Sequence, residues 1–337
     1  MLTHTLRAGE EIPDEVAVVI STSGTTGEPK GAMLPASALI ASADATHDRL
    51  GGSGRWLLAL PAHHIAGLQV LVRSALAGTT PVAISAAFDA SELPSAIASL
   101  GSGRRYASLV AVQLDKALRD PAASAALAEL DGVLIGGGPM PAQIAENASA
   151  AGISVIRTYG MSETAGGCVY DGTPLDGVRI RIDDGRIALG GTTLASGYRN
   201  AVTPDPFAEA GWFRTDDVGA VDNLGIFRVL GRADDAISTG GLTVMPPLVE
   251  SALLAHPAVV DAAVFGVTDE RLGQRVVAAV VVAEGHTAPT VAELRAHVEQ
   301  TMDATAAPRE VHVVDELPRR GIGKLDRRAL VERFDGV

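Results

Sequence analysis

The feature that most constrains this chain is a loop rich in glycine and hydroxyl residues, Ser21–Gly31, with the sequence STSGTTGEPKG. It follows an apolar run, Val16–Ile20, that is typical of a buried strand. Glycines let the backbone turn its N–H groups toward an anion, the hydroxyls add donors, and Lys30 adds a point charge. This combination favours binding of a polyphosphate over the alternative, a flexible surface loop. It is not a Walker loop, because Pro29 stands where that motif has its second glycine.

Length, charge and cysteine content narrow the class of protein. The chain has 337 residues, enough for two domains and a large core, and 47% of them are hydrophobic. A net charge of −13 argues against nonspecific binding to nucleic acid or to an anionic membrane, since both favour a basic surface. The single cysteine, Cys168, excludes an intrachain disulfide and suits a reducing compartment. Residues 1–10 lack an apolar signal core, and the longest apolar run, Val276–Ala283, is too short to span a bilayer. We therefore expect a cytoplasmic protein without membrane insertion.

Strand-like and helical patterns alternate in the first half of the chain, which favours a mainly parallel sheet with helices on both faces. Strand-like runs lie at Trp56–Leu60, Pro81–Ile84, Ala107–Val110, Val133–Ile135 and Ile153–Ile156. Helical patterns lie at Pro35–Leu50, Ile65–Leu76, Ser91–Leu100, Val112–Arg119 and Pro141–Ala151. In such sheets ligands bind beyond the carboxyl ends of the strands.

The pattern changes after about residue 170. Val178–Ile182 and Arg186–Leu189 flank an Asp-Asp-Gly turn, which predicts a hairpin. A small α+β unit is expected from its elements, Pro246–Leu254 (helix), Val259–Val267 and Arg275–Val282 (strands), Val291–Asp303 (helix) and Glu310–Val314 (strand). We therefore expect two domains, residues 1–231 and 232–337, with a short junction that suits a hinge.

Further motifs follow the loop, at Pro61–Gly67, Gly136–Pro139, Thr158–Thr164, Gly211–Gly219, Gly231–Gly241 and Leu317–Asp326. Four of them also have a plain structural explanation. The two histidines of PAHHIAG lack a third ligand at metal spacing, so a histidine at the edge of the core is the commoner outcome. The run GGGP is also typical of a tight turn, the acidic pair in GWFRTDDVG of a solvated turn, and the arginines around GIGKLD of a basic surface turn.

In this order the motifs resemble those of the adenylate-forming superfamily, which includes acyl-CoA synthetases, peptide-synthetase adenylation domains and luciferases. Residues 22–31 match every position of its loop motif, and the resemblance extends over about residues 16–330. It implies an α/β fold, with a large N-terminal domain of layered α/β sheets and a small mobile α+β C-terminal domain. The implied reaction has two steps. A carboxylate attacks the α-phosphate of Mg·ATP to give an acyl-adenylate and pyrophosphate; the small domain then rotates, and the thiol of CoA displaces AMP.

The resemblance also assigns roles to single residues. The implied ATP contacts are Thr22, Ser23, Gly24, Thr25, Thr26, Gly27, Lys30, Gly136, Gly137, Gly138, Tyr159, Asp217 and Arg232. Ser162, Glu163 and Lys324 are the implied catalytic residues, with Glu163 as the Mg²⁺ ligand and Lys324 as a charge beside the α-phosphate. Asp234 is the implied hinge, and Gly240 and Gly241 border the passage for CoA. His64 matches an acid-contacting histidine; polar residues near strand ends, Ser108, Gln113 and Thr158, complete the expected acid pocket.

The chain departs from the family pattern in informative places. Asp216 replaces a glycine, while Leu242 and Met245 replace a polar and an aromatic residue. Few residues precede the loop, so we expect a truncated N-terminal domain. This short start, together with PAHHIAG, resembles the o-succinylbenzoate–CoA ligases of actinobacteria, which act in menaquinone biosynthesis.

Three alternatives to that branch remain. The chain could ligate another aryl or alkyl acid, adenylate an acid for a carrier protein, or be a regulatory nucleotide-binding module that has lost catalysis. The presence of both Glu163 and Lys324 argues against the last of these. The sequence leaves the oligomeric state open, with a homodimer among the options.

Overall fold

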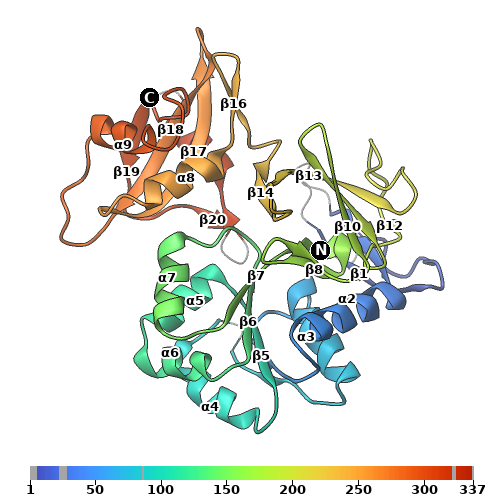
Figure 1. Cartoon of the computed structure of the whole chain (residues 1–337). Helices are drawn as coiled ribbons and strands as arrows, with labels where there is room; N and C mark the ends of the chain where they lie inside the picture. The colour runs from blue at the N-terminus through green and yellow to red at the C-terminus, as the bar shows by residue number, and fades with distance from the viewer. Residues whose placement is uncertain (1–5, 23–28, 86, 321–323, 336–337) are drawn as a thin grey trace. The chain divides into compact units, whose positions relative to one another are not determined.

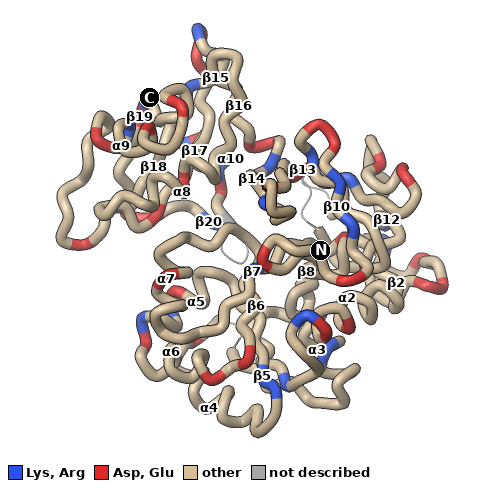
Figure 2. Tube along the Cα trace, viewed as in Figure 1, with Lys and Arg blue, Asp and Glu red and all other residues tan. Residues whose placement is uncertain are grey.

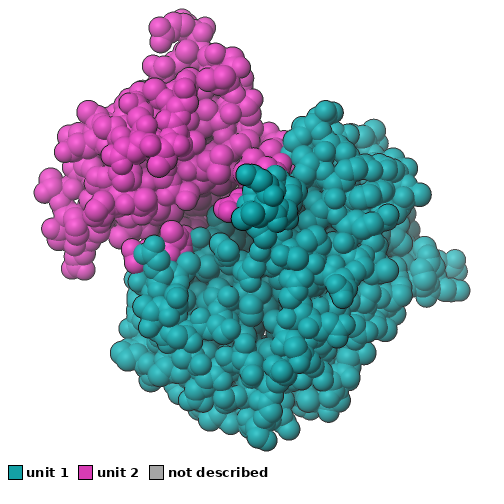
Figure 3. Space-filling model, in the orientation of Figure 1, with its two compact units in different colours: residues 1–140, 144–215, 221–227 teal, residues 141–143, 216–220, 228–337 magenta. Residues whose placement is uncertain are grey.

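The computed structural model describes residues 6–22, 29–85, 87–320 and 324–335, with Arg320 and Lys324 described by their backbones alone. The chain divides into two compact units, coloured separately in Figure 3. The first comprises Met1–Met140, Ile144–Thr215 and Val221–Phe227; the second comprises Pro141–Gln143, Asp216–Ala220 and Arg228–Val337. Each unit has hydrophobic clusters of its own.

The first unit is built around a seven-stranded sheet with the strand order β4-β3-β5-β6-β7-β8-β9 (Figure 1). Its parallel strands are β3 (Arg55–Leu58), β4 (Val82–Ala83), β5 (Arg105–Val110), β6 (Gly132–Gly136) and β7 (Val155–Met161). Two antiparallel strands, β8 (Gly166–Tyr170) and β9 (Thr173–Pro174), extend the sheet beyond β7. The prediction of a mainly parallel sheet is confirmed.

Helices cover both faces of this sheet. Alternate residues of each strand point to opposite faces, so each strand contributes side chains to the packing on both. Leu57 and Leu109 pack in a cluster with the helices η1 (Ala90–Glu92), α4 (Leu93–Ser99), α5 (Ala111–Leu118), α6 (Pro121–Ala128) and α7 (Ala142–Ala150) on their side of the sheet. Trp56 and Tyr106 pack with residues of α2 (Ala36–Arg49) and α3 (Ile65–Leu76) on the other side. The helix α6 was not predicted from the sequence.

Two smaller sheets are formed by other strands that precede β15 in the sequence. The three-stranded sheet contains β1 (Val16–Ile20), β2 (Ala32–Pro35) and β12 (Gly197–Tyr198). The four-stranded sheet contains β10 (Val178–Asp183), β11 (Arg186–Gly191), β13 (Trp212–Val221) and β14 (Phe227–Arg232). The predicted hairpin is confirmed: β10 and β11 pair antiparallel around Asp184 and Gly185, whose φ angles of 49° and 80° are those of a two-residue hairpin turn.

The second unit is a small α+β structure, as predicted. Its sheet contains β15 (Ile237–Thr239), β16 (Leu242–Val244), β17 (Val259–Asp269), β18 (Gly273–Val282) and β19 (Glu310–Val313). Residues of α8 (Pro246–Leu254) and α9 (Val291–Val298) pack with one hydrophobic cluster of the sheet, and residues of α10 (Arg327–Phe334) with another. A short hairpin of β20 (Arg319–Arg320) and β21 (Lys324–Leu325) precedes α10. The helix α9 ends five residues before the predicted Asp303, at Val298, and turns follow it.

Acidic and basic residues are interspersed along both units (Figure 2). Among the described residues, no helix is long and apolar enough to cross a membrane.

Candidate active site

The glycine- and hydroxyl-rich loop connects β1 to β2, which pair antiparallel. Its ends meet where the Lys30 N–H donates to the Thr22 carbonyl at 3.4 Å. Ser23, Gly24, Thr25, Thr26 and Gly27 lie outside the described residues, so their predicted phosphate contacts remain predictions.

A distant segment fixes the end of this loop. The Asn200 side chain donates to the Pro29 carbonyl at 2.7 Å, and the Asn200 N–H donates to the Lys30 carbonyl at 3.0 Å. The Arg199 N–H donates to the Gly31 carbonyl at 2.7 Å. The backbone of residues 29–31, around the lysine, is therefore held by two residues outside the predicted motifs, Arg199 and Asn200.

Tyr198 links the loop to Glu163. Its hydroxyl donates to Glu163 Oε1 at 2.6 Å, and the Lys30 ammonium lies 5.5 Å from the centre of its ring. Glu163 is 7% exposed. A carboxylate has about four acceptor positions, so the bond from Tyr198 leaves Glu163 able to accept more. One buried carboxylate linked through Tyr198 to the lysine of the predicted phosphate loop suits Mg²⁺, which usually takes one or two protein carboxylates together with substrate phosphates and water.

The turn that carries Glu163 is fixed by the core of the first unit. Ser162 and Glu163 lie in the short helix η2 (Ser162–Thr164), which ends at Ala165 with φ 51°. The Ala165 carbonyl accepts hydrogen bonds from Gln69 Nε2 at 2.7 Å and from Ser42 Oγ at 3.0 Å. These two buried donors hold a left-handed residue that would otherwise be unfavourable.

Two glycines of the predicted motifs are explained by close contacts, Gly160 with backbone and Gly136 with a side chain. A Cβ on Gly160 would lie 2.0 Å from the Gly166 carbonyl oxygen, so only glycine fits between β7 and β8 there. A Cβ on Gly136 would lie 2.5 Å from Thr158 Oγ1. Gly137 has φ 82° and is exposed, as is Gly138. The predicted adenine contacts at the ends of β6 and β7 are thus adjacent in the first unit.

Tyr159, the predicted adenine-stacking residue, is half-buried in β7. Its ring lies 5.6 Å from that of Phe227, centre to centre, with a tilt of 42°. This contact fixes the orientation of the tyrosine ring.

The four predicted acid-contacting residues differ in what they can offer. Gln113 Oε1 accepts from the Val110 N–H at 3.0 Å and its Nε2 donates to the Ala59 carbonyl at 3.0 Å, so this amide joins α5 to the end of β3. Thr158 Oγ1 donates to the Ile135 carbonyl at 3.2 Å, and a hydroxyl has one proton to donate. Ser108 is buried within β5.

His64 is the fourth of these residues. It is the N-cap of α3, and its ring lies 4.4 Å from that of His63. It is partly exposed at the carboxyl end of β3, where parallel sheets bind ligands.

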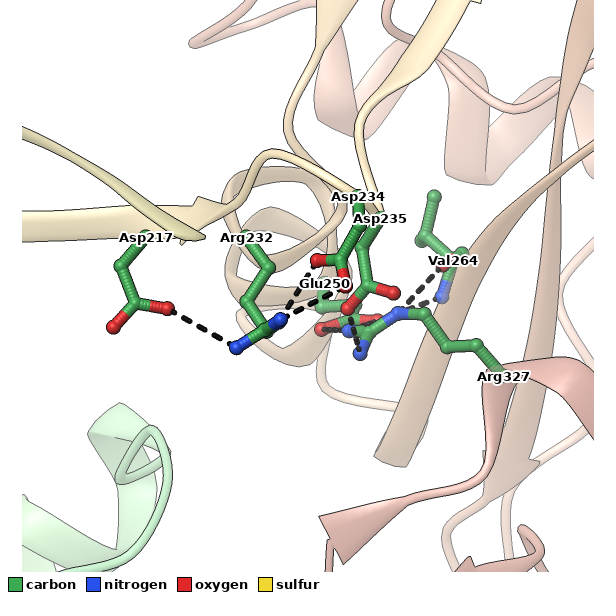
Figure 4. Close-up of polar contacts among 7 residues, drawn as sticks. All are labelled: Asp217, Arg232, Asp234, Asp235, Glu250, Val264 and Arg327. Atoms are coloured by element: carbon green, nitrogen blue, oxygen red, sulfur yellow. Dashed lines mark hydrogen bonds and ion pairs between the residues drawn. The ribbon is translucent and has the colours of Figure 1, made fainter. Parts of the chain in front are cut away.

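In the second unit, Arg232 connects the predicted ribose and hinge residues (Figure 4). Its guanidinium donates to both carboxylate oxygens of Asp234 at 2.8 Å, and its Nη1 lies 3.8 Å from Asp217 Oδ1. These carboxylates raise the pKa of Arg232, chiefly because Asp234 accepts hydrogen bonds from its guanidinium. Asp217 is mostly buried, and Asp216 beside it lies in the strand β13 without a positive φ, so the residue that replaces the usual glycine is not strained.

Gly240 and Gly241 form the turn between β15 and β16, with φ angles of 58° and 84°. A Cβ on Gly241 would meet nothing within 4 Å, so the positive φ of this turn explains the glycine. The expected passage for CoA beside these glycines remains a prediction. Lys324 lies in β21, opposite Arg320, and its side chain is outside the described part of the structure.

Comparisons with known proteins establish the family of this chain. A family model described as AMP-binding enzyme matches residues 5–198, and a model of the AMP-binding enzyme C-terminal domain matches residues 248–324. The chain therefore belongs to the AMP-binding enzyme family, the adenylate-forming enzymes that the motifs indicated.

Individual relatives and solved structures show which members of this family the chain is similar to. The chain is 68% identical to a probable 2-succinylbenzoate–CoA ligase of Mycobacterium tuberculosis, over 99% of this chain and 89% of the relative. Among solved structures, it is similar to o-succinylbenzoate CoA synthetase (MenE) from Bacillus subtilis in complex with the acyl-adenylate intermediate OSB-AMP, with a TM-score of 0.82 and 32% identity, covering 94% of this chain and 69% of the other. ATP-bound MatB from Rhodopseudomonas palustris has a TM-score of 0.86 and 27% identity, covering 97% and 69%.

Proposed function

We propose that this chain is an ATP-dependent, AMP-forming ligase that joins 2-succinylbenzoate to CoA through an acyl-adenylate, a step of menaquinone biosynthesis. The observation that supports this acid is the 68% identity, over nearly all of both chains, to a probable 2-succinylbenzoate–CoA ligase. The fold alone does not select the acid, since the TM-score to MatB is at least as high as that to the B. subtilis enzyme.

The residues of the first unit bind the nucleotide and stabilise its charge. Lys30 and the loop before it hold the phosphates, while the glycines after β6 and the ring of Tyr159 contact the adenine. Glu163 is the residue that would hold Mg²⁺, which neutralises phosphate charge when bound. Tyr198 orients Glu163 and contacts Lys30, so it links the metal ligand to the phosphate loop.

The residues of the second unit complete the two steps. Asp217 and Arg232 bind the ribose and phosphate, and Lys324 stabilises charge as an oxygen of the acid forms its bond to the α-phosphorus and pyrophosphate leaves. Between the two steps the small domain turns about Asp234. In the second step the CoA sulfur attacks the acyl carbon, and AMP leaves. The proposal places the enzyme in the cytoplasm, with no nucleic acid partner, and fits a monomer or a homodimer.

ATP–pyrophosphate exchange with a panel of acids tests this proposal. We expect exchange with 2-succinylbenzoate and thioester formation when CoA is added. Exchange without transfer to CoA would favour a carrier protein as acceptor, and exchange with a different acid would move the chain to another branch of the family. Nucleotide binding without any exchange would favour a regulatory module.

Glu163→Gln is expected to raise the Mg²⁺ concentration for half-maximal exchange by roughly tenfold, because a neutral amide is a weaker ligand for a hard cation. The measurement is a Mg²⁺ titration of pyrophosphate exchange, with Mn²⁺ binding to the enzyme–ATP complex followed by electron paramagnetic resonance. Glu129→Gln is the matched control, because the Glu129 side chain is 62% exposed and pairs with Arg105. Superimposable titrations of the wild type and Glu163→Gln would remove Glu163 as the ligand.

A further inference from the structure

Four segments of the second unit meet at the guanidinium of Arg327 (Figure 4). Arg327 is the first residue of α10, and its partners lie in other elements: Asp235 just before β15, Glu250 in α8, and Val264 in β17. These contacts span 63 to 92 residues of sequence separation. The guanidinium is therefore a junction of the fold, distinct from a local surface ion pair.

Each nitrogen of this guanidinium has a defined partner. Nη2 donates to both Glu250 oxygens, at 2.6 and 2.8 Å, and Nη1 donates to Asp235 at 3.3 Å. Nε donates to the Val264 carbonyl at 3.2 Å. Glu250 Oε1 also accepts from the Val264 N–H at 2.8 Å. Because a planar guanidinium bonds in fixed directions, this set of contacts specifies both position and orientation.

The junction is buried enough for its geometry to matter. The side chains of Glu250 and Arg327 are 6% and 19% exposed. Burial raises the pKa of the Glu250 carboxyl, while the neighbouring Arg327 favours its charged form. Apolar residues of similar volume often stabilise a protein as well as a buried ion pair does, so stability alone is a weak reason for this pair. A requirement for exact placement of the attached segments is a stronger one.

The segment attached to Arg327 carries Lys324, the lysine of the adenylation step. The intervening residues are tightly held: the Asp326 N–H donates to the Pro318 carbonyl at 2.8 Å, and the Asp326 carboxylate caps α10 at the Ala329 N–H, at 3.1 Å. On the other side of the junction, Asp235 follows Asp234, the proposed hinge residue. Arg327 thus connects the chain around the lysine to the chain around the hinge.

We propose that Arg327 is a positioning residue for Lys324: held by Glu250, Asp235 and Val264, it sets where the β20–β21 hairpin presents the lysine during adenylate formation. It does not touch the reacting atoms. This inference rests on the proposed function in taking Lys324 as a residue of the adenylation step alone. It follows that loss of the Arg327 contacts impairs adenylation selectively, whereas a general destabilisation of the second unit would impair both steps.

The test compares the two half-reactions in Arg327→Met and Arg327→Lys. Adenylation is measured by ATP–pyrophosphate exchange, and transfer by thioester formation from supplied acyl-adenylate and CoA. We expect Arg327→Met to lower kcat for exchange roughly tenfold, because misplacement of a catalytic group by even 1 Å is costly, with transfer unchanged. Arg327→Lys keeps the charge but loses the forked geometry, so its loss is expected to be smaller.

Arg328→Met is the matched control, since the Arg328 side chain is 78% exposed and pairs with Glu332, four residues away on the same helix. Thermal unfolding shows whether each variant is folded; if Arg327→Met is not, Arg327→Lys and Glu250→Gln provide the comparison. Equal losses in both half-reactions, or no loss in folded Arg327 variants, would overturn the inference. A wild type that exchanges pyrophosphate only with another acid would contradict the proposed substrate instead, and the half-reactions would then be compared with that acid.

Discussion

Benzoate and medium-chain fatty acids are expected to be ligated to CoA with kcat/KM roughly 10⁴-fold below that of 2-succinylbenzoate, because a site built to hydrogen-bond a substrate group rejects analogues that lack it. 2-Succinylbenzoate has a second carboxylate, on its aromatic ring. That anion must be hydrogen-bonded or stay in water, since burial without a partner is unfavourable. The measurement is kcat/KM for the three acids at saturating ATP and CoA.

The structure makes His64 the first residue to test for this discrimination. One of the two Gln113 amide protons and the single Thr158 hydroxyl proton already have backbone acceptors, as Gln113 Nε2 donates to Ala59 and Thr158 Oγ1 to Ile135. A hydrogen bond to a charged group contributes about 1.5–3 kcal/mol, so His64→Ala is expected to lower kcat/KM for 2-succinylbenzoate roughly 10- to 100-fold and to affect benzoate much less.

His63→Ala is the matched control, because His63 is the exposed neighbour in the same turn. A fatty acid or benzoate that is used as well as 2-succinylbenzoate by the wild type would contradict the assignment of the acid. The protein would then be a CoA ligase of broader specificity. If His64→Ala lowers kcat/KM equally for 2-succinylbenzoate and benzoate, His64 does not recognise the second carboxylate.

Lys324→Ala is expected to lower the rate of adenylate formation by about a hundredfold or more, the effect of removing one preorganised charge contact at the transition state. Thioester formation from supplied acyl-adenylate is expected to continue at the wild-type rate, since the proposed function assigns the lysine to the first step alone. The measurements are pyrophosphate exchange and single-turnover transfer to CoA.

Lys116→Ala is a suitable control, because Lys116 is exposed on α5 and belongs to none of the motifs. A Lys324 variant with equal deficits in the two half-reactions would contradict the division of labour between them. It would also remove the premise on which the role of Arg327 rests.

The elements that the sequence predicted well have strong local patterns. The helices α3 and α8 begin and end where their apolar patterns do, at Ile65–Leu76 and Pro246–Leu254. The hairpin of β10 and β11 follows from its Asp-Gly turn. For α6 a local signal was present but overlooked: Asp120 caps the helix at the N–H groups of Ala122 and Ala123, and a proline follows it, although the alanine-rich sequence shows little apolar periodicity.

The part of the candidate site that the sequence did not reveal depends on contacts between distant segments. Tyr198 reaches Glu163 from β12, a strand of two residues that exists only because it pairs with β2. Such a short strand has no pattern of its own from which to predict it. The same holds for Asn200, whose bonds to Pro29 and Lys30 cross most of the first unit's sequence. The motifs in the sequence identify residues such as Lys30 and Glu163. The fold is needed to show which residues from distant segments lie beside them.

The position of α3 has a consequence for redesign of the enzyme. His64 occupies the N-cap position of this helix, and Gln69, about one turn further on, donates to the carbonyl of Ala165, two residues after Glu163. Between them, Gly67 packs so closely that a Cβ there would lie 2.3 Å from the Pro61 carbonyl oxygen. Libraries that aim to change which acid is accepted should therefore vary residues 62–64 and keep the helix from Gly67 onward constant. A change of substrate range can then be selected without altering the support of the nucleotide site.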